Sequence, residues 1–255
     1  MMDYITPDWP APDHVKTLFT TRCGGVSDNT CGAYASLNLG MHVNDNPDHV
    51  SANRKLLRQY LPSEPQWLTQ VHGSDHVWIE QTGGLLQADA ALSRSPGVVC
   101  AVMVADCLPV YLCDDAGTTV GIVHAGWRGL SAGIVEKSVA AMHIEPGRIM
   151  AWLGPAIGPA HFEIGDEVRT IFIDHDPHAA RAFRSVGDTV IQPQQKWYAD
   201  IFQLARFRLI NAGVNRIYGG GVCTYSDPVR FFSYRRDGKT GRMAALIWLE
   251  KTCKR

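Results

Sequence analysis

The chain has 255 residues, of which 45% are hydrophobic and 19% charged, a composition typical of a globular protein rather than a disordered, fibrous or repetitive one. The 24 Lys and Arg residues nearly balance the 25 Asp and Glu residues, and the formal net charge is -1. This balance argues against the basic surface of a nucleic-acid-binding protein and against binding to an anionic membrane. We therefore expect a small-molecule partner.

The N-terminal residues and the cysteines predict a cytoplasmic protein. Residues 1–15 contain three prolines and no Lys or Arg before an apolar segment, unlike a secretory signal peptide, and no apolar run reaches the length of a membrane span. The seven cysteines are odd in number and are not spaced like the paired set of a secreted disulfide-rich protein. We expect one domain over residues 1–255 in the reducing cytoplasm.

The first part of the chain predicts a strand, a glycine-containing loop and a helix. Apolar and polar residues alternate over residues 15–20, as in a strand, and a loop with paired glycines follows. Arg22 beside this loop either faces an anion or lies exposed at a turn. A helix is expected over residues 46–60 with Asp48 as its N-cap. Arg54 lies on this helix, where an arginine ordinarily faces solvent.

A further strand is predicted over residues 66–71, and it runs directly into His72, where Gly73 lets the backbone turn. His76 lies four residues beyond His72, but Gly73 and the β-branched neighbours disfavour the helix that a paired histidine metal motif needs. Asp89 precedes the next strands and either orients a histidine or caps a turn.

Two central strands also end in reactive side chains. Residues 98–105 and 120–123 are short, apolar and rich in β-branched residues, as buried strands are. Asp106 and Cys107 follow the first, and His124 follows the second. Strand ends in layered α/β folds are where ligand and catalytic groups collect. We therefore expect the thiol and the imidazoles to meet there.

A glycine-rich turn, residues 126–129, follows His124 and opens a predicted helix over residues 130–143. The amides and dipole of such a helix can hold an anion, and Arg128 lies in the turn. The glycine spacing fits neither the dinucleotide-binding fingerprint nor the phosphate-binding P-loop.

The last part of the chain predicts a helix and a hairpin. Asp200 is the expected N-cap of a helix that ends at Asn211. Residues 231–236 and 242–250 predict a closing β-hairpin around an Asp-Gly turn. Its first strand contains the sequence Tyr-Arg-Arg, which either lines a pocket or forms an exposed basic surface.

His72, Cys107 and His124 together can bind a zinc ion with three protein ligands and leave a fourth position open, as in catalytic rather than structural zinc sites. Zinc in such a site lowers the pKa of a coordinated water and polarises a substrate atom, while Asp106 acts as a base or orients a neighbouring ligand. Without a metal, Cys107 and His124 can instead form the nucleophile and base of a cysteine hydrolase. The residues alone leave both interpretations open.

Taken together, the sequence closely resembles the YfiH-type family of laccase-domain proteins, also named polyphenol oxidases, over most of its length. The resemblance rests on the predicted helix after Asp200 and on the segments TTRCGGVS, SLNLG, NRKLL, TQVHG, ADA, ADCLPV, GIVHAGWRG, LGPAIGP, FEIG and FFSYRRDGKTGRMAALIWL. Each segment alone is weak evidence, but the set is highly specific.

The resemblance implies an α/β (α+β) fold, a mixed-sheet α/β/β/α sandwich related to hydrolases of the cytotoxic necrotizing factor type. It places the metal ligands at His72, Cys107 and His124, with zinc as the cofactor and copper as the alternative. It also implies phosphate-dependent cleavage of adenosine, inosine and methylthioadenosine to the base and a pentose 1-phosphate, and deamination of adenosine. A zinc-dependent purine nucleoside phosphorylase is therefore the leading hypothesis.

Phosphate requires cationic partners, and a guanidinium suits its oxygens better than an ammonium. The candidates are Arg54, Arg22 and Arg128. Asn38 is available for ribose hydroxyls, and Arg235 for the wall of the substrate pocket.

Rival activities come with the same resemblance. A copper-dependent laccase needs a larger set of copper ligands than the single cluster expected here. A peptidoglycan-editing amidase would use Cys107 and His124 to remove L-serine from a UDP-muramyl precursor. A third hypothesis is a non-catalytic binding protein in which the metal only clips the fold, although structural zinc normally has four protein ligands.

Overall fold

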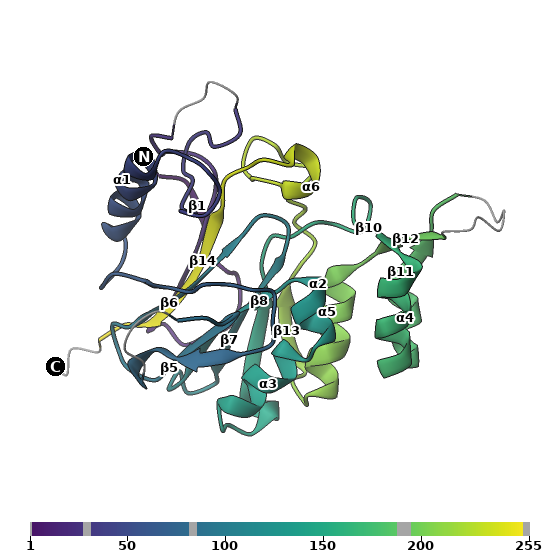
Figure 1. Ribbon diagram of the computed structural model, residues 1–255. Helices are drawn as coiled ribbons and strands as arrows, with labels where there is room; N and C mark the ends of the chain where they lie inside the picture. Colours follow the sequence, from purple (N-terminus) through teal and green to yellow (C-terminus); the bar gives the residue numbers. More distant parts are fainter. Residues whose placement is uncertain (1, 28–31, 82–85, 188–194, 252–255) are drawn as a thin grey trace.

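Two mixed β-sheets stacked face to face form the centre of the protein (Figure 1). The computed structural model describes residues 2–27, 32–81, 86–187 and 195–251. The first sheet has, in order, the strands β1 (Tyr4–Ile5), β2 (Val15–Thr20), β14 (Met243–Leu249), β6 (Val99–Val104) and β3 (Gln66–Trp67). The second has β13 (Arg216–Gly219), β9 (Ile149–Leu153), β7 (Leu108–Asp114), β8 (Val120–Ala125), β5 (Ala90–Ser93) and β4 (His76–Trp78).

Side chains of the two sheets pack between them because alternate residues of a strand point to opposite faces. On β7, Tyr111 points toward the first sheet and packs in one cluster with Phe19 and Ile247. Val110 and Leu112 of the same strand belong to the cluster on the other face. β7 is buried on both faces, which explains its nearly continuous apolar sequence.

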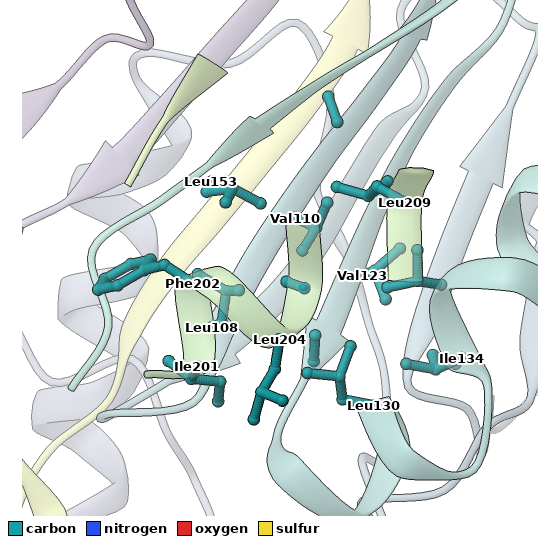
Figure 2. Packing of buried hydrophobic residues seen from close by; sticks show 14 of the residues in the cluster. Leu108, Val110, Val123, Leu130, Ile134, Leu153, Ile201, Phe202, Leu204 and Leu209 are labelled. Carbon is teal, nitrogen blue, oxygen red and sulfur yellow. The ribbon is translucent and has the colours of Figure 1, made fainter. Parts of the chain in front are cut away.

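Helices cover the outer face of each sheet. α1 (Pro47–Arg58) packs on the first sheet, and α2 (Trp127–Ser131), α3 (Ile134–Ala141) and α5 (Ile201–Asn211) pack on the second. Figure 2 shows Leu204 and Leu209 of α5 beside Val110 and Val123 of the second sheet. This order of layers confirms the predicted mixed-sheet α/β/β/α sandwich.

A smaller sheet extends the molecule to one side, at the right of Figure 1. Its strands are β10 (Glu163–Gly165), β12 (Lys196–Ala199) and β11 (Phe183–Ser185), and α4 (Asp166–His175) packs beside them. Short 3-10 helices occur at Ile79–Gln81, Pro146–Arg148 and Pro177–Ala182. No helix in the described part of the chain is long and apolar enough to cross a membrane.

The predicted C-terminal hairpin is wrong. The Ser233 hydroxyl accepts a hydrogen bond from the Arg236 amide and caps the short helix α6 (Tyr234–Asp237), so the Tyr-Arg-Arg sequence is helical. β14 then pairs with β2 and β6 rather than with the preceding segment. Long-range pairing therefore overrides the local turn signal.

Two helices also differ in detail from the prediction. The expected helix over residues 130–143 is two helices, because Gly133 adopts a left-handed conformation with φ 85° between α2 and α3. Asn46 rather than Asp48 caps α1, since its side chain accepts the Asp48 amide. The predicted Asp200 cap of α5 is confirmed.

Candidate metal centre

The structure brings together the three predicted metal-ligating side chains, His72, Cys107 and His124. One donor atom from each lies within 4.8 Å of the other two. His72 lies where the chain passes from β3 in the first sheet to β4 in the second, and Cys107 lies where it passes from β6 to β7. His124 is near the end of β8. The centre therefore lies where the two segments that connect the sheets, β3 to β4 and β6 to β7, approach the end of β8.

Asp89 holds the turn that presents His72. The φ of His72 is 59°, in the left-handed region that non-glycine residues rarely occupy. The Asp89 carboxylate accepts hydrogen bonds from the amides of Val71, His72 and Gly73 at 3.1, 3.0 and 2.7 Å. These bonds stabilise an otherwise unfavourable backbone conformation next to the candidate ligand.

The same carboxylate orients His124. The Asp89 Oδ1 atom lies 2.7 Å from the His124 Nδ1 atom, and both side chains are buried. This contact leaves Nε2 of His124 as the nitrogen available to a metal. The sequence left open whether Asp89 orients a histidine or caps a turn, and in the structure it does both.

Cys107 and His124 shift each other's pKa. Burial alone raises the pKa of a thiol, but the imidazoles of His124 and His72 stabilise the thiolate and lower the pKa of Cys107 to about 6. Burial alone lowers the pKa of an imidazole, but Cys107 and Asp89 raise the pKa of His124 to about 9. Between these two pKa values the metal-free centre is a thiolate beside an imidazolium.

We expect iodoacetamide to alkylate Cys107 of the metal-free protein with a rate that rises as the pH passes about 6, because the thiolate is the reactive form. An unperturbed thiol shows this rise near about pH 8.5. Mass spectrometry of the Cys107 peptide measures the profile, and added zinc should slow the reaction by occupying the thiolate. A midpoint near that of an ordinary thiol would contradict the assignment.

The three donors line one wall of a cavity of about 820 Å³. Gly126 gives the donors room, since a Cβ atom there would lie 3.0 Å from the Cys107 Sγ atom and 3.2 Å from the His72 Cδ2 atom. Two imidazoles, a thiolate and an open side toward a cavity fit a zinc ion with one exchangeable position. The residues present therefore fit the implied metal.

Of the predicted phosphate-binding arginines, Arg54 lines this cavity. Arg22 lies elsewhere among the described residues: its guanidinium donates to the carbonyls of residues 32, 35 and 228. Arg128 stacks on the Trp127 ring at 4.3 Å, outside the lining of the cavity. Arg235 borders a smaller neighbouring cavity of about 110 Å³. The structure thus separates the three arginines predicted to bind phosphate, and it places Arg235 outside the lining of the main cavity.

Asn38 and Asp106 also lie outside the lining of the main cavity. Asn38 is fully buried, and its amide oxygen accepts the amides of Gly40 and Arg242. The Asp106 carboxylate accepts hydrogen bonds from the hydroxyls of Thr224 and Ser233 and from the amide of residue 235. Both side chains hold loops together.

Most of the other cavity residues were not singled out by the sequence analysis. The cavity is also lined by Met41, His42, Trp67, Leu68, Thr69, Gln70, Met103, Val104, Ala105, Tyr234 and Arg242. The Tyr-Arg-Arg sequence signalled a lining role for Tyr234, but no local pattern marked His42 or Arg242.

Residues 16–250 match the family model described as multi-copper polyphenol oxidoreductase laccase. The chain belongs to this laccase family. The purine nucleoside phosphorylase YfiH of Escherichia coli is 53% identical over 252 residues, which cover 98% of this chain and 100% of that protein. A purine nucleoside phosphorylase of Pseudomonas aeruginosa is 47% identical over 250 residues, with the same two coverages.

Solved structures of similar proteins share the fold of this laccase-family chain. A crystal structure of a Neisseria meningitidis protein matches with a TM-score of 0.90 and 49% identity over 97% of this chain and 99% of that one. YlmD of Geobacillus stearothermophilus matches with a TM-score of 0.84 and 33% identity over 95% and 94% of the two chains. These likenesses confirm the resemblance to YfiH-type proteins inferred from the sequence.

The laccase family's description names several coppers, whereas the described residues of this chain bring together one group of three metal-ligating side chains. One such group supplies ligands for a single metal ion.

Proposed function

We propose that the chain is a zinc-dependent purine nucleoside phosphorylase whose active site is the cavity beside His72, Cys107 and His124. The observation that carries the proposal is that the three donors open into one cavity of about 820 Å³, a volume in the range of small-molecule sites. The names of the Escherichia coli and Pseudomonas aeruginosa relatives support the reaction, since both are purine nucleoside phosphorylases.

The chain's own residues prepare this site. His72, Cys107 and His124 would hold the zinc ion, which when bound supplies Lewis-acid polarisation of a substrate atom. Asp89 fixes the orientation of His124 through Nδ1. Tyr234, which is 61% exposed, offers an aromatic surface and a hydroxyl to a purine at the cavity wall.

In the proposed reaction, a phosphate oxygen forms a bond to the anomeric carbon of the ribose as the bond from that carbon to the purine nitrogen breaks. The base leaves with the electron pair and takes up a proton, and the other product is a pentose 1-phosphate. We propose adenosine, inosine and methylthioadenosine as substrates, with deamination of adenosine as a second activity.

Asp106 is proposed as a positioning residue rather than a base. Its carboxylate already accepts three hydrogen bonds, from Thr224, Ser233 and the Arg235 amide, at 2.6, 3.0 and 2.7 Å. These bonds join the residue before Cys107 to the start of α6. The carboxylate thereby fixes Tyr234 and Cys107 relative to each other.

The proposal predicts about one zinc ion per chain in the purified protein and release of adenine from adenosine only when phosphate is present. Elemental mass spectrometry and chromatographic assay of the base measure the two quantities. A rate of adenosine turnover that does not depend on phosphate would refute phosphorolysis. Selective release of serine from a UDP-muramyl-serine precursor, with no nucleoside turnover, would assign the site to an amidase instead.

A further inference from the structure

Two arginines in the cavity form no ion pair with a carboxylate among the residues that the structure describes. Arg54 comes from α1 and Arg242 immediately precedes β14, yet both line the cavity that contains the candidate metal ligands. Neither forms an ion pair within the described residues. In contrast, the buried Arg208 pairs with Glu136 at 2.9 Å. Two partly buried cations without a counter-ion are costly unless a ligand supplies the negative charge.

Both guanidinium groups are held in place and keep donors free. Nε and Nη2 of Arg54 donate to the Leu39 carbonyl at 3.0 and 2.9 Å, and its guanidinium lies 4.1 Å from the centre of the Trp67 ring. Nη1 of Arg242 donates to the carbonyls of Thr240 and Gly241. In the described part of the chain, Nη1 of Arg54 and Nε and Nη2 of Arg242 form no hydrogen bond.

The loop at residues 38–40 contacts both arginines. The Leu39 amide donates to the Arg242 carbonyl at 3.1 Å, while the Leu39 carbonyl accepts from Arg54. Asn38 accepts the Arg242 amide at 2.9 Å. A Cβ atom on Gly40 would lie 2.9 Å from Cγ of Arg242, so only glycine lets this side chain lie against the loop. The loop therefore contacts the side chain of Arg54 and both the backbone and the side chain of Arg242.

Arg54 and Arg242 are the arginines of the cavity lining, and Cys107 and Asp106 act on Arg242 electrostatically without a hydrogen bond to it among the described residues. Burial, then Arg242 and Arg54, lower the pKa of His42, which therefore lines the cavity as a neutral imidazole. Glu64 acts on Arg54 electrostatically, while its carboxylate accepts a hydrogen bond from Nε1 of Trp67. The free N–H groups suit the oxygens of a tetrahedral oxyanion, which guanidinium groups bind in a directional way.

We propose that Arg54 and Arg242 form an oxyanion subsite for inorganic phosphate, in the same cavity as the candidate metal ligands. The inference deepens the proposed phosphorylase activity, on which it rests, by assigning the co-substrate to two residues. A phosphate held there shares one cavity with the nucleoside. The subsite also explains why the cavity contains two arginines that form no ion pair with a carboxylate in the described part of the chain.

Titration of the zinc-loaded protein with inorganic phosphate in a calorimeter tests the subsite. We expect Arg54→Gln and Arg242→Gln each to weaken phosphate binding about 10- to 100-fold, as loss of charge-assisted hydrogen bonds would. The KM for phosphate should rise in parallel, and the KM for adenosine should stay within about two-fold. Arg184→Gln, an exposed arginine outside the cavity, is the matched control.

Lysine variants distinguish a specific loss of phosphate binding from a loss of folding. Arg54→Lys and Arg242→Lys keep the charge but lose the planar fork, so phosphate binding should fall between wild type and the Gln variants, with Tm unchanged. Failure of the wild type to bind phosphate, or unchanged phosphate affinity in both Gln variants, would overturn the subsite. If the variants lose phosphate binding but no protein releases base, the subsite stands and the phosphorylase proposal fails.

Discussion

Replacing Cys107 with alanine is expected to remove the bound metal and to lower kcat/KM for adenosine phosphorolysis at least about 1,000-fold, equivalent to about 4 kcal/mol of transition-state stabilisation. The thiolate is one of three donors within 4.8 Å, and two imidazoles alone make a weaker zinc site. Elemental analysis of the purified variant and steady-state kinetics measure the two losses. The fold should persist, because the change removes one sulfur atom from a partly exposed side chain.

Cys23→Ala is the matched control for this prediction. Cys23 is also partly exposed, and its Sγ atom lies 3.2 Å from the Val229 carbonyl, away from the cavity lining. We expect this variant to keep metal and activity. A Cys107→Ala protein that retains metal but loses activity would instead identify Cys107 as a nucleophile, consistent with its lowered pKa.

Two donors of the candidate metal centre were predictable from strands with a strong local signal: Cys107 comes shortly after β6, and His124 lies near the end of β8. The predicted strand before His72 is shorter in the structure and ends at Trp67. The apolar runs before Cys107 and at His124 predict buried strands wherever they pair. Each strand carries a metal-ligating side chain at or just beyond its end. The general rule that functional groups collect near strand ends in layered folds then predicts that the thiol and the imidazoles meet.

The second half of the cavity was not predictable in this way, because loop contacts between distant residues build it. Arg242 enters the cavity through bonds to the 38–40 loop, about two hundred positions earlier in the chain. The same loop buries Asn38, whose polar side chain the sequence assigned to substrate. In each case the deciding partner is remote in sequence.

Asp89→Asn is expected to affect both stability and metal binding, because one carboxylate serves the His72 turn and His124. Oδ1 of Asp89 lies near the His72 amide and His124 Nδ1, while Oδ2 accepts the amides of Val71 and Gly73. An asparagine turns one oxygen into an NH2 donor, which leaves one of these pairs unsatisfied. We expect a loss of about 3 kcal/mol in the free energy of unfolding.

Metal affinity and kcat/KM of the Asp89→Asn protein should fall by about 10- to 100-fold, as when the carboxylate behind a ligating histidine is removed. Zinc competition titrations, kinetics and urea unfolding separate the effects. Asp114→Asn is the control: this buried carboxylate also accepts two amides, of Thr118 and Thr119, but lies away from the cavity lining. It should lose stability and keep metal affinity. If both variants bind zinc as the wild type does, Asp89 stabilises the turn without positioning His124 for a metal.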